Sequence, residues 1–157
     1  MIDVETQDDT PEDELRRAEH LVYVSLKYTR TRDVMLNAIK RMVSAYELGF
    51  HKYLKSKIKS GCIKEIPQTI NEKSVLVKSM TGSKTKKHFI LYSLLKRIEK
   101  SRCEGEEEFR KNVTLIAKPK IGNAKDIRVK TKDLEEFLAV TKEFVLFLRS
   151  ESKWQEQ

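Results

Sequence analysis

The large side chains of this sequence recur at intervals of three and four positions, which is the period of an amphipathic α-helix. The clearest series lies within residues 132–150 and consists of Leu134, Phe137, Leu138, Thr141, Phe144, Val145 and Leu148. A second series lies within residues 32–59 and consists of Met35, Ile39, Met42, Tyr46, Phe50, Tyr53 and Leu54. Only 5 of the 157 residues are glycine and 3 are proline, which argues against an all-β fold. The pattern predicts a mostly α-helical single domain, folded as a bundle of four or five helices.

Capping residues set the boundaries of the first two predicted helices. Thr10 precedes a proline and three acidic residues, and together they predict a helix over residues 11–28. The polar run at 29–33 predicts a short corner, in which Thr31 caps a second helix over residues 32–59. At 1.5 Å per residue this second helix would be about 42 Å long.

The second half of the chain is predicted to add shorter elements. Gly61 begins a loop, and further helices are expected over residues 71–80, 83–102 and 132–150. The last of these is predicted to be capped by Thr131. Two β-like runs, at 113–117 and 127–129, flank Gly122-Asn123 and predict a small β-hairpin over about 113–130. Residues 104–111 are expected to form a polar turn or to continue the preceding helix, and residues 151–157 a polar tail.

The charge of the chain changes sign along its length. Residues 1–20 hold 8 acidic and 2 basic side chains, residues 52–102 hold 3 and 14, and residues 133–157 hold 6 and 3. The middle segment thus carries a net charge of +11, more than the +8 of the whole chain. This concentration favours a polyanionic partner, and the alternative is that lysines merely solvate a helical surface. Residues 1–9 are expected to be a flexible acidic tail, which we hypothesise folds over the basic face.

Ten basic residues are predicted to contact nucleic-acid phosphates. Lysine dominates the set, which favours contact with the phosphate backbone over reading of bases. Two arginines flank the predicted corner, where a planar guanidinium suits a phosphate. The alternative is that either arginine pairs with Asp33, or with acids of the first helix, and fixes the corner. The ten residues are Arg30, Arg32, Lys55, Lys59, Lys84, Lys86, Lys87, Lys96, Arg97 and Lys100.

No catalytic residue, metal site or cofactor is predicted. The histidines are scattered and lack a neighbouring ligand at a recognised spacing: His20, His51 and His88. Residues 82–85, Gly-Ser-Lys-Thr, resemble the end of a phosphate loop but lack its first glycine. Cys62 and Cys103 form no CxxC motif and are predicted to be reduced thiols. No apolar run suits a membrane span and no secretory signal is recognisable, so a cytoplasmic location is expected.

Two helices joined at a tight corner, with SAYELGFHKYL at 44–54 on the second, resemble a HEPN-type helical bundle over residues 11–111. The segment YVSLKYTRTRDV at 23–34 is also similar to one in small uncharacterised archaeal proteins. Ribonucleases of the HEPN superfamily use an arginine followed a few residues later by histidine. The nearest match in this chain is Arg110, and no histidine follows it. The resemblance therefore implies a non-catalytic binding module, with a homodimer as a further expectation.

The expected function is non-catalytic binding of RNA or a ribonucleoprotein through the basic middle third of the chain. One alternative is a metal-independent ribonuclease of HEPN type, which requires an acid–base residue that the sequence does not identify. Another is a dimerisation or adaptor module whose partner is an acidic protein. The three differ in whether RNA binds with strong salt dependence, and in whether it is cut.

Overall fold

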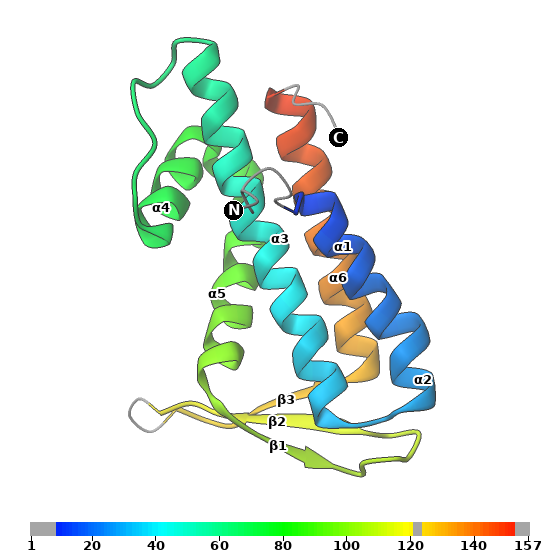
Figure 1. The fold of residues 1–157 in the computed structure, drawn as a ribbon. Helices are drawn as coiled ribbons and strands as arrows, with labels where there is room; N and C mark the ends of the chain where they lie inside the picture. Colours follow the sequence, from blue (N-terminus) through cyan, green and yellow to red (C-terminus); the bar gives the residue numbers. More distant parts are fainter. Residues whose placement is uncertain (1–8, 121–123, 153–157) are drawn as a thin grey trace, which may run out of the picture.

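The computed structural model describes residues 9–120 and 124–152, and Figure 1 shows their arrangement. The predicted mostly α-helical class is confirmed, with a small antiparallel sheet at one end of the helices. The helices are α1 (Pro11–His20), α2 (Leu26–Tyr28), α3 (Arg32–Lys59), α4 (Ile70–Thr81), α5 (Lys86–Lys100) and α6 (Thr131–Ser152). A π-helical turn (Leu21–Ser25) joins α1 to α2, and a 3-10 turn (Gly82–Thr85) joins α4 to α5.

Helix α1 and the long helix α3 begin at the residues predicted from their caps. The Thr10 hydroxyl accepts a hydrogen bond from the Asp13 amide at 3.1 Å, and the Asp13 carboxylate accepts one from the Thr10 amide at 3.1 Å. This reciprocal capping box satisfies two amides that the start of α1 would otherwise leave unpaired. The Thr31 hydroxyl accepts from the Val34 amide at 3.3 Å in the same way. The π-helical turn between α1 and α2 was not predicted.

Helix α3 is the central element of the fold. It packs against α1, α5 and α6, and α4 lies beside the half of α3 remote from the sheet (Figure 1). The core between α3, α5 and α6 is aromatic: the centroid of the Phe144 ring lies 4.7 Å from that of Tyr46 and 5.8 Å from those of Phe50 and Phe89. Burying these rings is what holds the three helices together, because each removes a large apolar area from water.

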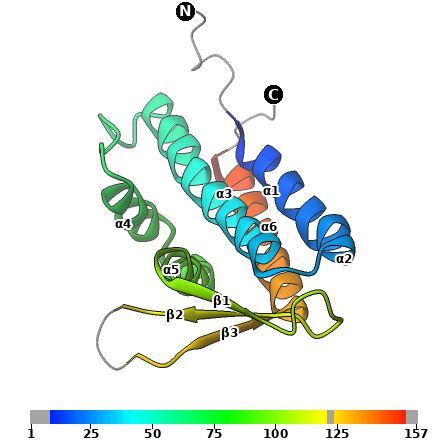
Figure 2. The same cartoon turned by 60° about the horizontal axis from the view of Figure 1, so that its bottom comes forward.

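A three-stranded sheet lies across one end of the helix bundle (Figure 2). Its strands are β1 (Arg102–Glu106), β2 (Thr114–Lys118) and β3 (Ile127–Lys130), antiparallel in that order. The predicted hairpin is confirmed as β2 and β3, although its expected turn at Gly122-Asn123 lies outside the described residues. The expectation of a turn or helix over 104–111 was wrong at residues 104–106, which belong to β1.

Strand β1 escaped prediction because its side chains give no β signal. Only Cys103 is buried, and the strand also contains two glutamates and a glycine, which are depleted in strands. Its order comes from pairing with β2, together with ion pairs across the sheet, such as Lys118 to Glu104 at 3.8 Å. Such tertiary partners override local propensity.

The last helix starts differently from the prediction. Thr131 is the first residue of α6 and not its cap. The carboxylate of Asp133 instead accepts a hydrogen bond from the Lys130 amide at 2.8 Å, which is one half of a capping box. At its other end α6 continues to Ser152, two residues beyond the predicted boundary. Helix α5 begins at Lys86 because Gly82, at φ 63°, ends α4 and a 3-10 turn intervenes.

The burial of His88 predicts that folding stability depends on pH. Its ring is buried against Phe144, at a centroid distance of 5.4 Å, and within the described residues its Nδ1 has no hydrogen-bond partner. Burial lowers the pKa of His88, and neighbouring Lys87 lowers it further, while Glu143 and a hydrogen bond to the Val140 backbone act against the shift. The unfolded chain therefore binds a proton more readily than the native one.

We expect the free energy of unfolding to fall as the pH falls from about 7 toward the lowered native pKa of His88. One such group contributes a slope of at most about 1.4 kcal/mol per pH unit. Urea unfolding at pH 7, 6 and 5 measures the slope. His88→Gln keeps a side-chain donor but does not titrate, so its slope should be shallower; equal slopes would contradict the prediction.

Candidate functional site

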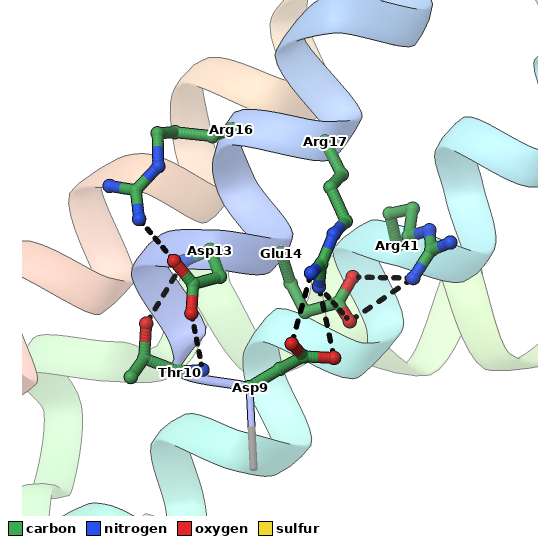
Figure 3. Close-up of polar contacts among 7 residues, drawn as sticks. All are labelled: Asp9, Thr10, Asp13, Glu14, Arg16, Arg17 and Arg41. Atoms are coloured by element: carbon green, nitrogen blue, oxygen red, sulfur yellow. Dashed lines mark hydrogen bonds and ion pairs between the residues drawn. The ribbon is translucent and has the colours of Figure 1, made fainter. Parts of the chain in front are cut away.

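Three arginine side chains gather where α1 packs on α3. We call Arg16, Arg17 and Arg41 the arginine cluster; the first two lie on α1 and the third on α3 (Figure 3). The two helices converge at this point because α1 buries Ala18 and the turn after it Val22, while α3 buries Ala38 and other small or apolar residues along the contact. This packing brings together side chains that are 24 positions apart in sequence.

Glu14 fixes two of the three arginines. Its side chain is only 4% exposed. Both of its carboxylate oxygens accept from Nη1 of Arg41 at 3.2 Å, and one accepts from Nη1 of Arg17 at 3.2 Å. A buried carboxylate needs such partners because burial of an unpaired charge is costly. Glu14 therefore holds the two guanidinium groups side by side from behind.

Arg17 also holds Asp9 through both arms of its guanidinium. Its Nη1 lies 2.9 Å from one oxygen of Asp9, and its Nη2 donates to the other oxygen at 3.0 Å. This is the bidentate geometry in which arginine binds carboxylates and phosphates. The hydrogen bond to Asp9 raises the pKa of the Arg17 guanidinium above its ordinary value.

Arg16 pairs with a different carboxylate, that of Asp13. The pKa of Asp13 is lowered, chiefly by its hydrogen bond from the Thr10 backbone and also by its contacts with Arg16. Figure 3 shows Arg16 and Arg17 leaving α1 toward different acids, with Arg41 reaching Glu14 from α3. The acids thus organise the cluster without enclosing it.

A shallow hollow of about 410 Å³ opens beside the cluster. It is lined by Asp13, Arg16, Arg17, His20, Leu21 and Arg41. His20 and Leu21 stand where α1 gives way to the π-helical turn, a feature frequently found at functional sites. The volume lies within the range typical of small-molecule sites, and the lining favours an anion.

The structure spreads the ten predicted contact residues along the bundle. Lys55 and Lys59 lie at the end of α3 remote from the sheet, and Lys84, Lys86 and Lys87 lie at the start of α5 and the turn before it. Arg30 and Arg32 lie at the corner before α3, at the other end of a helix about 42 Å long. Arg97 and Lys100 lie near the sheet, in the last turns of α5, and Lys96 precedes them (Figure 1).

Three of the ten side chains are engaged in contacts within the fold, and one of these, that of Arg32, lies at the corner. Arg32 lies 3.0 Å from Asp33 and donates from its side chain to the Cys103 carbonyl, and its amide donates to Glu108 at 2.8 Å. The Arg30 carbonyl accepts from the Phe109 amide at 2.6 Å, so the corner is tied to the loop after β1. This favours the structural alternative for Arg32.

The other two are lysines held by acids. Lys96 lies 3.0 Å from Glu47 and is partly buried, and the same carboxylate oxygen accepts from the Tyr92 hydroxyl at 2.7 Å. Lys87 lies 2.9 Å from Glu143, and its hydrogen bond lowers the pKa of that carboxyl. In contrast, Lys55, Lys59, Lys84, Lys86, Arg97 and Lys100 are exposed and make no ion pair within the described residues.

The arginine cluster itself was missed by sequence reasoning. Asp13 to Arg16 and Glu14 to Arg17 are spaced three apart, which is the ordinary spacing of ion pairs on a helix surface. The net negative charge of residues 1–20 also concealed two arginines among eight acids. Nothing local indicated Arg41, whose approach depends on how α1 packs against α3.

Other chemistries find little support in the described residues. Within them, no group of three His, Cys, Asp or Glu side chains is placed to hold a metal ion. Both cysteines are free thiols, as predicted; Cys62 is exposed, whereas Cys103 is buried and burial raises the pKa of its thiol. A raised pKa disfavours the reactive thiolate.

Comparisons with known proteins give no family to which the chain can be assigned. No helix within the described ranges has the length and apolar character needed to cross a membrane. The resemblance to HEPN bundles stays a prediction. Searches of protein-family models, of curated proteins and of solved structures each find no match for this chain.

Proposed function

We propose that the protein is a non-catalytic RNA-binding module that contacts phosphates through lysines at the α4 end of the bundle. One observation carries the proposal. Lys55, Lys59, Lys84 and Lys86, which we call the lysine group, are exposed and have no acidic partner within the described residues. They belong to the segment 52–102, where bases outnumber acids by 14 to 3.

The chemistry of the lysine group suits phosphate backbones more than bases. An ammonium on a flexible stem acts as a point charge, so it neutralises phosphates without fixing their orientation. Lys55 and Lys59 lie one helical turn apart on α3, and Lys84 and Lys86 lie where α5 begins. Binding of such lysines to a polyanion releases the counterions that the polyanion had condensed, which is the main source of non-specific affinity.

Binding of structured RNA at two salt concentrations tests the proposal. A protein that neutralises six or more phosphates loses roughly 10³-fold or more in affinity between 50 and 200 mM salt. The four members of the lysine group alone should give a loss of roughly 50- to 150-fold over that range, from a slope of about −0.7 to −0.9 per contact. Fluorescence anisotropy of a labelled hairpin RNA measures the affinity at each salt concentration.

The same samples, analysed on a denaturing gel, separate the proposal from its alternatives. Intact RNA with a steep salt dependence supports a binding module. Shortened RNA would overturn the non-catalytic assignment and favour the alternative, a metal-independent ribonuclease of HEPN type. Affinity that is absent at 50 mM salt would overturn RNA binding and direct the search to acidic proteins.

A further inference from the structure

The hollow beside the arginine cluster has a fixed donor array. Glu14, nearly buried, positions Arg17 and Arg41 from behind through contacts of 3.2 Å. Arg16 and His20 line the same hollow from α1. Guanidinium groups that are already held in place lose little conformational entropy when an anion binds. The site is therefore preorganised for an anion.

The anion position at Arg17 is already marked by a carboxylate. Asp9 accepts from both arms of the guanidinium, at 2.9 and 3.0 Å, as two phosphate oxygens would. Asp9 precedes the capping residue Thr10 and is not part of α1. An external anion that binds both arms of the Arg17 guanidinium would have to take the position that Asp9 occupies.

Asp9 is also the acid in this network that is most easily displaced. The side chains of Asp9 and Arg17 are each 43% exposed, whereas that of Glu14 is 4% exposed. Ion pairs between exposed groups contribute little, because water and salt compete for both partners. An incoming anion of higher charge can therefore replace Asp9 while Glu14 continues to hold the two arginines.

We infer that the arginine cluster is a binding site for a phosphate group, and that Asp9 occupies this site when no ligand is bound. A terminal phosphate carries a charge of about −1.5 to −2 at pH 7, against −1 for a carboxylate. It also has a third oxygen, which can face Arg41 or Arg16 while two remain on Arg17. The site lies on α1 and α3 and does not include the lysine group.

Calorimetric titration of the full chain with inorganic pyrophosphate, at constant ionic strength, tests the inference. Arg17→Lys keeps the charge but removes the bidentate fork, and we expect its affinity to fall about tenfold. Asp9→Asn removes the internal competitor, and we expect its affinity to rise about threefold or more. The two changes act in opposite directions on one equilibrium.

Arg128→Lys is the matched control. Arg128 is an exposed arginine that also pairs with a carboxylate, that of Glu106, but it lies on β3 at the sheet. The affinity of the Arg128→Lys variant for pyrophosphate should match that of the wild type within twofold. If Arg17→Lys also matches the wild type, or if Asp9→Asn does not gain, the inference is overturned. Thermal unfolding of each variant checks that the fold is retained.

Two short RNAs of one sequence, with a 5′-phosphate or a 5′-hydroxyl, identify the source of the phosphate. Tighter binding of the 5′-phosphorylated strand, lost in Arg17→Lys, assigns the site to a terminal phosphate on RNA. Equal binding of both strands, weakened alike by Arg17→Lys, assigns it to backbone phosphates. Pyrophosphate binding without any effect of Arg17→Lys on either RNA supports the site with a free polyphosphate as its ligand. Absence of all three interactions overturns the site.

Discussion

Replacing Phe144 by alanine should lower the free energy of unfolding by about 3–5 kcal/mol. Phe144 is fully buried on α6 and its ring contacts those of Tyr46 and Phe50 on α3 and of His88 and Phe89 on α5. Phe144 thus contacts two rings on each of the two neighbouring helices. Truncation would remove the ring contacts and leave a cavity that several rigid rings cannot easily fill.

Urea unfolding followed by circular dichroism measures this change. Phe109→Ala is the matched control, since Phe109 is the same residue type but is 74% exposed in the loop after β1. Its effect should stay within about 0.5 kcal/mol. A loss below about 1.5 kcal/mol for Phe144→Ala would contradict a central role for the aromatic core in stability.

The helices of this protein could be predicted because their signals are local. Thr10 and Thr31 cap helices through amides only three residues away, so the start of each helix was readable to the residue. The series in α6 that contains Phe144 identified its buried face for a similar reason. Strand β1 could not be predicted, since its order depends on pairing with β2, from which a seven-residue loop separates it.

The candidate sites were less readable because charge along a sequence does not reveal pairing in space. Lys96 looked like a member of a basic surface, but Glu47 and Tyr92, on two different helices, hold it in a partly buried network. Arg32 proved to be a structural tie between the corner and β1. The net charge of a segment therefore indicated a surface, while the tertiary structure decides which of its cations remain available.

Reversing the charge of the lysine group should weaken RNA binding on the order of 10³-fold at about 0.1 M salt, because each phosphate contact contributes roughly 0.7–0.9 decade of affinity per tenfold dilution of salt. The variant carries Lys55→Glu, Lys59→Glu, Lys84→Glu and Lys86→Glu. All four side chains are exposed, so substitution should leave the core intact. The slope of log affinity against log salt concentration should also become shallower, by the contribution of about four phosphate contacts.

A second variant with the same change in net charge separates a local surface from a general effect of charge. It reverses four exposed lysines near the sheet: Lys111, Lys125, Lys130 and Lys132. These lie at the opposite end of α3 from the lysine group, more than a Debye length of about 8 Å away at physiological salt, so their influence on it is screened. We expect less than a tenfold loss of affinity, measured by the same anisotropy titration. Equal losses in the two variants would show that RNA senses only the total charge, and the α4 end would then have no special part in binding.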